Sequence, residues 1–385
     1  MVAGIYIHIP FCKKACNYCD FYFITSLKYE SDYIKSLTKE IDLRKSEFND
    51  IKIDTIYFGG GTPSILNEKS LYNILNSISK NCVLNNNLEI TIECNPDDIS
   101  ILKLKSYKSL NINRLSIGVQ SFNDEDLKFM KRVHNGVQAQ KSIQLSQDQG
   151  FTNISIDLIY GLPTSNIKIW KKNLEIFKKF NLVHLSSYSL TVEKNTLLFN
   201  LVKKKNMEKK IEDNVINQFI ILLKEMKKYD YENYEISSFC INKMYSKHNC
   251  SYWNGEKYIG IGVAAHSFDG IKRRWNKSHI KNYIINLSNN KLIYDFEILD
   301  NRDLYNEYIL TSLRTSWGCS ITKLIKLFPK QYIKHFYHQI EKYQKVNYVI
   351  KKNINYCLTD QGKLFSNKVI SDLFISKDEN LNIVE

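Results

Sequence analysis

Residues 8–20 read His-Ile-Pro-Phe-Cys-Lys-Lys-Ala-Cys-Asn-Tyr-Cys-Asp, and they place three cysteines, Cys12, Cys16 and Cys19, within eight positions. Thiolates at this spacing on a tight loop can converge on one small inorganic centre. A structural zinc ion needs a fourth ligand, normally from a second cysteine or histidine pair, and none follows nearby. An iron–sulfur cubane held by three thiolates instead keeps one iron open for an external ligand.

The cysteine stretch follows a short β-rich run, and strand and helix patterns alternate from there onward. Six strand–helix units in succession predict a parallel sheet with right-handed crossovers. The predicted strands are residues 4–10, 55–59, 88–94, 114–120, 153–160 and 184–191, and the predicted helices include residues 29–47, 67–80, 136–149, 165–180 and 208–229.

The predicted strands end in glycine, proline or polar residues. A glycine triplet, residues 59–61, follows the second strand, and Glu93, Gln120 and Asp157 lie at or near the ends of later ones. A (β/α) barrel builds its site from the carboxyl ends of several strands, whereas a doubly wound sheet concentrates ligand contacts at one switch point. The sequence therefore predicts an α/β protein with an incomplete (β/α)6 barrel of the TIM type.

The pattern changes after about residue 230, where short strands replace the strand–helix units. The last part of the chain reads as helices followed by a small β-hairpin, which resembles a winged helix. We predict a barrel at residues 1–230, a mixed α/β extension at residues 231–300 and a winged-helix-like C-terminal α+β domain at residues 301–385. The later predicted elements are strands 234–239, 258–263 and 273–275, helices 302–316, 320–328 and 331–344, strands 347–351 and 355–358, and a helix from residue 360.

Composition excludes several classes of protein. The 385 residues carry a formal net charge of +14, but only seven of the 54 basic residues are arginine. Readers of base edges favour arginine, so we expect no nucleic-acid partner. Nine cysteines are too dilute for a disulfide framework. No apolar run approaches about 18 residues and the first residues lack a signal-peptide pattern, so we expect a cytoplasmic protein without an integral membrane span.

The C-x3-C-x2-C loop, with Tyr18 before its last cysteine, resembles the signature of radical S-adenosylmethionine (SAM) enzymes. The resemblance implies that Cys12, Cys16 and Cys19 bind a [4Fe-4S] cluster whose open iron takes the amino and carboxylate groups of SAM. Residues 59–63, Gly-Gly-Gly-Thr-Pro, resemble the glycine-rich segment of that family, where backbone without Cβ can approach the ligand closely.

Four segments together resemble the oxygen-independent coproporphyrinogen III dehydrogenase family: residues 8–12, 59–63, 118–122 and 157–163. Carried over to this sequence, the resemblance implies SAM contacts for residues of suitable chemistry, since carboxylates and amides accept from ribose hydroxyls or an amine and arginine pairs with a carboxylate. These residues are Tyr6, Tyr18, Gly61, Thr62, Glu93, Gln120, Arg132 and Asp157.

Two features resemble a different branch of the superfamily, the HemW-type heme chaperones. Dehydrogenases of the family have a further cysteine two positions after the triad, whereas Asp20-Phe21 follows Cys19 here. Residues 248–253 read as H-N-x-x-Y-W, which resembles a motif of the heme-chaperone group. The resemblance implies that His248, Tyr252 and Trp253 contact heme, but His248 and Trp253 packing the barrel mouth is an equal alternative.

The combined expectation is a heme chaperone that binds a [4Fe-4S] cluster, SAM and heme and passes heme to an acceptor protein. An electron donor such as a flavodoxin or ferredoxin is implied as a further partner. The alternative is a radical SAM coproporphyrinogen III dehydrogenase or another tetrapyrrole-modifying radical enzyme. The missing fourth cysteine argues against the dehydrogenase activity, and no catalytic residue is assigned.

Overall fold

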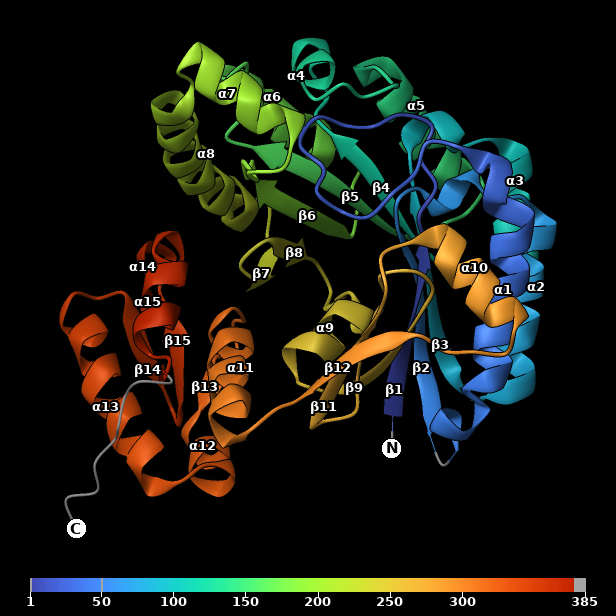
Figure 1. The fold of residues 1–385 in the computed structure, drawn as a ribbon. Coiled ribbons are helices and arrows are strands. Elements are labelled where there is room, and N and C mark those ends of the chain that lie inside the picture. Colours follow the sequence, from blue (N-terminus) through green and yellow to red (C-terminus); the bar gives the residue numbers. More distant parts are fainter. Residues whose placement is uncertain (1, 50, 377–385) are drawn as a thin grey trace.

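The computed structural model describes residues 2–49 and 51–376. Its centre is a curved sheet in which six consecutive strands run parallel, each joined to the next through at least one helix (Figure 1). Each pairs with its sequence neighbour, which is the order of a (β/α) barrel rather than of a doubly wound sheet. The strands are β1 (Val2–Ile9), β2 (Lys52–Gly60), β3 (Val83–Cys94), β4 (Arg114–Gln120), β5 (Asn153–Tyr160) and β6 (His184–Ser189).

The barrel helices begin at the residues that favour helix starts. Asn67, Ser100, Asn135 and Asn166 each accept a backbone N–H of the first helical turn, which satisfies one of the donors a helix start leaves unpaired. Three of the barrel helices, Ile101–Ser109, Asp124–Phe129 and Leu197–Lys205, have no counterpart among the predicted helices. The helices are α1 (Glu30–Leu43), α2 (Glu68–Asn81), α3 (Ile101–Ser109), α4 (Asp124–Phe129), α5 (Gly136–Asp148), α6 (Ile167–Lys179), α7 (Leu197–Lys205) and α8 (Glu208–Lys228).

The mixed region after residue 230 extends the same sheet at both edges. On one side β8 (Ser238–Cys240) pairs antiparallel with β6 and carries β7 (Glu232–Glu235) beyond it. On the other side β9 (Lys257–Ile261) pairs parallel with β1. Beyond β9 lie β10 (His266–Phe268), β11 (Lys272–Asn276) and β12 (Tyr294–Ile298), all antiparallel, while α9 (Lys247–Trp253) and α10 (Ile280–Ser288) join the segments.

The C-terminal part has its own sheet and its own hydrophobic core. Its three antiparallel strands lie in the order β13-β15-β14, and Tyr305, Phe336 and Val349 are among the side chains buried there. Helices followed by a hairpin match the predicted winged-helix-like arrangement. The elements are α11 (Asn301–Leu313), β13 (Cys319–Ser320), α12 (Ile321–Leu327), α13 (Lys330–Lys345), β14 (Val349–Lys352), β15 (Asn355–Leu358), α14 (Asp360–Leu364) and α15 (Ser366–Asp372).

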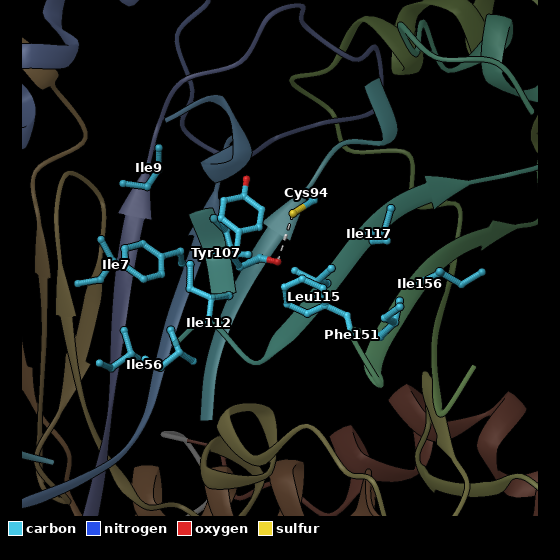
Figure 2. Close-up of a cluster of buried hydrophobic side chains, with 14 of the residues drawn as sticks. Ile7, Ile9, Ile56, Cys94, Tyr107, Ile112, Leu115, Ile117, Phe151 and Ile156 are labelled. Atoms are coloured by element: carbon cyan, nitrogen blue, oxygen red, sulfur yellow. Dashed lines mark hydrogen bonds between the residues drawn. The ribbon is translucent and has the colours of Figure 1, made fainter. Parts of the chain in front are cut away.

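The main core lies between the strands and the helices outside them. Figure 2 shows Ile7 from β1, Ile56 from β2, and Leu115 and Ile117 from β4 among these buried side chains, together with Tyr107 from α3. Because side chains alternate along a strand, apolar residues on the outer face leave the inner face to the residues between them. The inner face of the barrel is therefore mainly polar, and it surrounds the candidate site.

Two absences concern the described part of the chain. No helix within residues 2–49 and 51–376 is long and apolar enough to cross a bilayer. All nine cysteines lie in these ranges as free thiols.

Candidate functional site

A cavity of about 510 Å³ opens at the carboxyl ends of the barrel strands. It brings together residues that lie far apart in the sequence. The three clustered cysteines, the glycine segment and the polar strand ends all contribute to its wall. Of the predicted cluster and SAM residues, Cys12, Cys16, Cys19, Tyr18, Gly61, Thr62, Glu93, Gln120, Arg132 and Asp157 line this one cavity.

Tyr6 is the predicted SAM residue that is not in the cavity wall. Its hydroxyl lies 3.3 Å from His8 Nδ1, and its ring stacks on Tyr57 with the ring centroids 6.1 Å apart. Nε2 of His8 lies 3.1 Å from the carbonyl oxygen of Tyr22, three residues beyond Cys19. Tyr6 and His8 therefore link β1 to the end of the cysteine loop.

The cysteine loop is held at its base and at its tip. At the base, the backbone N–H of Cys12 donates to the Ile24 carbonyl (2.9 Å), and Ile24 returns a bond to Pro10 (2.7 Å). At the tip, the Asn17 side chain donates to the Phe129 carbonyl (2.6 Å), and the Asn17 carbonyl accepts from Leu198 (2.8 Å). The loop thus spans from β1 to α4 and α7, and its three thiols are held at the cavity.

Two of the thiols receive hydrogen bonds from residues across the cavity. Thr62 Oγ1 donates to Cys12 Sγ (3.5 Å), and Arg132 Nη1 donates to Cys16 Sγ (3.5 Å). Burial raises the pKa of Cys12, and it raises the pKa of Cys19 to about 11. These thiols are therefore protonated at neutral pH until a metal centre displaces their protons.

The residues present fit a [4Fe-4S] cluster of the three-cysteine kind. Across residues 2–49 and 51–376, no three His, Cys, Asp or Glu side chains are grouped as ligands of a single metal ion. Three half-buried thiols nevertheless line one cavity, with hydroxyl and guanidinium donors directed at two of the sulfurs. Hydrogen bonds to sulfur are one of the means by which proteins tune such clusters.

The glycine segment lies against the root of the cysteine loop. Gly61 N–H donates to the Ile9 carbonyl (2.8 Å), and a Cβ at Gly61 would meet the Phe11 carbonyl oxygen at 2.8 Å. Gly60 has a φ of +109°, and a Cβ there would meet the His8 ring. Only residues without a side chain let these two backbones lie so close together.

Gly61→Ala should therefore displace the cysteine loop and lower the iron and sulfide content of anaerobically reconstituted protein. The new Cβ would meet backbone atoms of residues 9–11, which cannot move aside as a flexible side chain could. We expect at least a tenfold loss, the lower bound for disturbing a metal centre's supporting residues. The control is Gly255→Ala, which strains the backbone at a left-handed φ of +69° but has nothing within 4 Å and lies outside the cavity wall. Equal cluster content in both variants would contradict the prediction.

Two carboxyl groups face the cavity from β3 and β5. Glu93 accepts from the Tyr57 hydroxyl (2.8 Å) and from the Gly60 N–H (3.2 Å), and Asp157 accepts from the Ser116 hydroxyl (3.4 Å). Burial raises the pKa of Glu93 to about 7 and that of Asp157 to about 6. Both side chains can accept hydrogen bonds from a ligand, and both change protonation near neutral pH.

Arg132 is fixed by its neighbours. Its Nη2 donates to Asn95 Oδ1 (2.6 Å) and to the Gly118 carbonyl (2.9 Å). Its Nε is buried without a partner in the described residues. Gln120, at the carboxyl end of β4, has a left-handed φ of +66°, and the β4–β5 register shifts there. Such a conformation is uncommon for a residue with a side chain and marks the end of β4 as irregular.

Comparison with known proteins places this geometry in a family. The radical SAM superfamily model matches residues 6–177. The heme chaperone HemW of Bacillus subtilis is 33% identical over 368 residues, which cover 94% of this chain and 97% of that protein. The heme chaperone HemW of Buchnera aphidicola subsp. Acyrthosiphon pisum is 37% identical over 314 residues, 81% of this chain and 82% of that one.

This chain belongs to the HemW family of the radical SAM superfamily. A solved structure, coproporphyrinogen III oxidase (HemN) from Escherichia coli, matches with a TM-score of 0.80 at 21% identity and covers 97% of this chain and 90% of its own. At that identity the likeness concerns the fold. It confirms the predicted barrel fold, and the match extends through the C-terminal part.

The H-N-x-x-Y-W motif of this HemW-family chain lies on α9, at the amino ends of the barrel strands. His248 is buried, with Nδ1 2.7 Å from Thr55 Oγ1 and Nε2 2.8 Å from the Tyr252 hydroxyl. Its ring stacks on Tyr57 with the centroids 5.0 Å apart, and burial lowers its pKa to about 3. Both ring nitrogens are engaged in this conformation, which favours the packing interpretation of His248 over iron ligation.

The other two residues of the motif also pack against protein. The Tyr252 ring meets Tyr258 edge to face with the centroids 4.7 Å apart. The guanidinium carbon of Arg314 lies over the Trp253 ring, 5.1 Å from the ring centroid. Trp253 therefore contacts the C-terminal part. Asn249 is the motif residue that lines the cavity.

Sequence reasoning did not single out several further cavity residues. They include Tyr57, Arg114, Ser116 and Ser186, and also Asn249, which belongs to the H-N-x-x-Y-W motif but had no role assigned from the sequence. A signal for two of them was present, since Arg114, Ser116, Gly118 and Gln120 alternate with apolar residues along β4. That alternation predicts a shared face of the strand, although it does not say which face is the inner one.

Proposed function

We propose that this protein is a cytoplasmic heme chaperone that binds a [4Fe-4S] cluster, SAM and heme and passes heme to an acceptor protein. The main support is the match to HemW of Bacillus subtilis over 97% of that protein. Cys12, Cys16 and Cys19 would hold the cluster at the cavity mouth. The cluster would supply one-electron chemistry and an open iron for SAM, with a flavodoxin- or ferredoxin-like electron donor.

The cavity residues then have separate tasks in holding SAM. Arg132 presents a fixed cation beside Cys16, which suits the carboxylate of SAM. Glu93 and Asp157 offer acceptors for ribose hydroxyls or an amine. Gly61 lets the backbone approach the ligand, and Thr62 keeps its hydroxyl at Cys12. Tyr18, half-buried against the α4 region, would flank the same ligand. Tyr6, which lies outside the cavity wall, would act through its contacts with His8 and Tyr57.

We propose that His248, Tyr252 and Trp253 assist heme binding by positioning the cavity wall and do not ligate the heme iron. The Thr55 hydroxyl at Nδ1 of His248 holds α9 against β2, whereas the Tyr252 hydroxyl at Nε2 belongs to α9 itself. α9 in turn sets Asn249 in the cavity wall. These three residues would therefore shape the wall that heme meets.

The function is tested by titrating anaerobically reconstituted protein with heme and following the Soret band. A saturable Soret band is expected, and the bound heme should move to an apo-hemoprotein on mixing. His248→Ala is expected to keep the Soret maximum while lowering the melting temperature, because the variant leaves the Thr55 and Tyr252 hydroxyls unpaired. A shifted maximum would restore His248 as an iron ligand. A wild-type protein without saturable heme uptake would contradict the proposal.

The same reconstituted protein separates the chaperone from the dehydrogenase. Incubation with SAM, a reductant and coproporphyrinogen III should leave the tetrapyrrole unchanged, because Cys19 is followed by Asp20-Phe21 rather than by the further cysteine of the dehydrogenases. Release of carbon dioxide would favour the enzyme instead.

SAM affinity should weaken as the pH falls from 8 to 6. The carboxylate form of Glu93 accepts ligand hydrogen bonds, and its pKa of about 7 means that most of it is protonated at pH 6. If only the ionised form binds, the Kd should rise about tenfold over this range. Glu93→Gln should flatten this dependence, whereas Glu341→Gln, at an exposed side chain, should not. A wild-type Kd that is constant from pH 6 to 8 would contradict the assignment.

A further inference from the structure

The cavity continues below the residues proposed to hold SAM. On β4, the inward positions Arg114, Ser116, Gly118 and Gln120 all line it. Gln120 ends the strand and Arg114 begins it, so the cavity follows β4 for about 20 Å at ~3.3 Å per residue. The proposed SAM contacts lie toward the carboxyl end. Arg114 therefore forms part of the floor.

Arg114 is a buried cation without a direct partner. The residue is 1% exposed, and its Nε has no hydrogen-bond partner. No hydrogen bond or ion pair joins its guanidinium to another residue within the described ranges 2–49 and 51–376. Buried charged groups are normally paired and hydrogen-bonded, because losing contact with water is unfavourable. A guanidinium that lines a cavity in this state is available to a ligand.

The surroundings of Arg114 add neutral donors and flat faces. Ser116 and Ser186 contribute hydroxyls to the wall, and Asn249 contributes an amide that forms no side-chain hydrogen bond within the described part of the chain. The rings of Tyr57 and Tyr188 line the same space. The floor thus combines one cation with uncharged hydrogen-bonding groups beside aromatic surface.

The carboxyl groups of Glu93 and Asp157 interact electrostatically with Arg114. Both lie higher in the cavity, and neither forms an ion pair with Arg114 within 4.0 Å. Their pKa values of about 7 and about 6 mean that each is partly protonated at neutral pH, although Arg114 lowers both. Neither carboxyl group contacts the guanidinium of Arg114, so its N–H groups stay open to a ligand.

We propose that Arg114, with Ser116 and Asn249 beside it, forms an anion subsite that binds a carboxylate of an organic ligand with a flat apolar body. A guanidinium presents paired N–H groups that match a carboxylate in a bidentate arrangement, and the tyrosine rings suit an apolar body. The identity of that ligand rests on the proposed function: a propionate arm of a tetrapyrrole has this chemistry.

The test uses metal-free coproporphyrin III and its tetramethyl ester as fluorescent probes of the cluster-reconstituted protein. Both carry the same macrocycle, and neither contains iron, so ligation by a protein side chain does not contribute. The ester is presented from a mild detergent at one fixed concentration in all samples. Wild-type protein should bind the acid more tightly than the ester.

Arg114→Met should weaken acid binding by about tenfold or more, the usual effect of losing a charged hydrogen bond, and leave ester binding unchanged. Arg114→Lys should recover part of the acid preference. If Arg114→Met does not fold, Asn249→Ala provides a second test. It should weaken binding of the acid by a smaller factor and leave binding of the ester unchanged. Arg302→Met, which removes an arginine of the C-terminal part, should bind both probes as the wild type does.

The outcomes separate this subsite from the wider function. A wild-type protein that binds acid and ester equally, or an Arg114→Met variant that keeps the full acid preference, overturns the subsite alone. An equal loss for both probes shows that Arg114 only maintains the structure and also overturns it. A wild-type protein that binds neither probe overturns the subsite together with tetrapyrrole binding.

Discussion

Cys16→Ala should nearly abolish the iron–sulfur cluster. The variant removes one of three thiolates and takes away the sulfur that Arg132 contacts at 3.5 Å. A cubane on three thiolates already has one iron without a protein ligand, so two thiolates leave half of its irons unsupported. We expect iron and sulfide content, and the broad visible absorbance of reconstituted protein, to fall by more than about tenfold.

Cys82→Ala is the matched control for this variant. Cys82 is also half-buried, but it lies at the end of α2 and outside the cavity wall. It should load the cluster to the wild-type level. Full loading of Cys16→Ala would contradict the assignment, as would wild-type protein that takes up zinc but neither iron nor sulfide.

Arg44→Ala should cause a large loss of stability without touching the cavity. The Arg44 side chain is fully buried and donates to Glu40 (3.1 Å), to the Gly260 carbonyl (2.6 Å) and to Ser267 (3.1 Å). These bonds join α1 to β9 and β10. Removing one partner of a buried pair leaves the other charge uncompensated, which costs about 3–5 kcal/mol of unfolding free energy.

Chemical denaturation of Arg44→Ala and Lys345→Ala measures this difference. Lys345 pairs with Glu341 at 2.9 Å, but both side chains are more than half exposed. Exposed ion pairs contribute little to the free energy of unfolding, so this control should unfold close to the wild type. If the two variants differed by less than about 1 kcal/mol, the buried network would not be what joins α1 to the added strands.

Much of the fold follows from local sequence pattern. The six parallel strands and most of the barrel helices match the predictions. Hydrophobic periodicity and helix-capping residues are local features, so they can be recognised within a short stretch of sequence. The helices that were not predicted include α4, which is only six residues long, and α9, which contains the H-N-x-x-Y-W motif. Elements this short depend on tertiary packing more than on their own propensity.

The cluster site could be predicted from the sequence because it depends on the spacing of three cysteines. Cys12, Cys16 and Cys19 lie on one loop, so their proximity is covalently fixed. The contact of Gly61 with the root of that loop is different. It arises because parallel strands β1 and β2 are neighbours, and the sequence predicts it only through the fold.

The sequence by itself determined the family, the barrel and the residues at its carboxyl edge, because each depends on short-range pattern or on the end of a strand. Only the tertiary structure decided which way the remaining polar residues face. In the structure, His248 contacts Thr55 and Tyr252, and Asn249 lines the cavity. Arg114 lies at the cavity floor with its Nε unpaired among the described residues. The physical reason is that side-chain direction depends on how a strand or short helix is docked, and the residues that fix the docking are distant in the sequence.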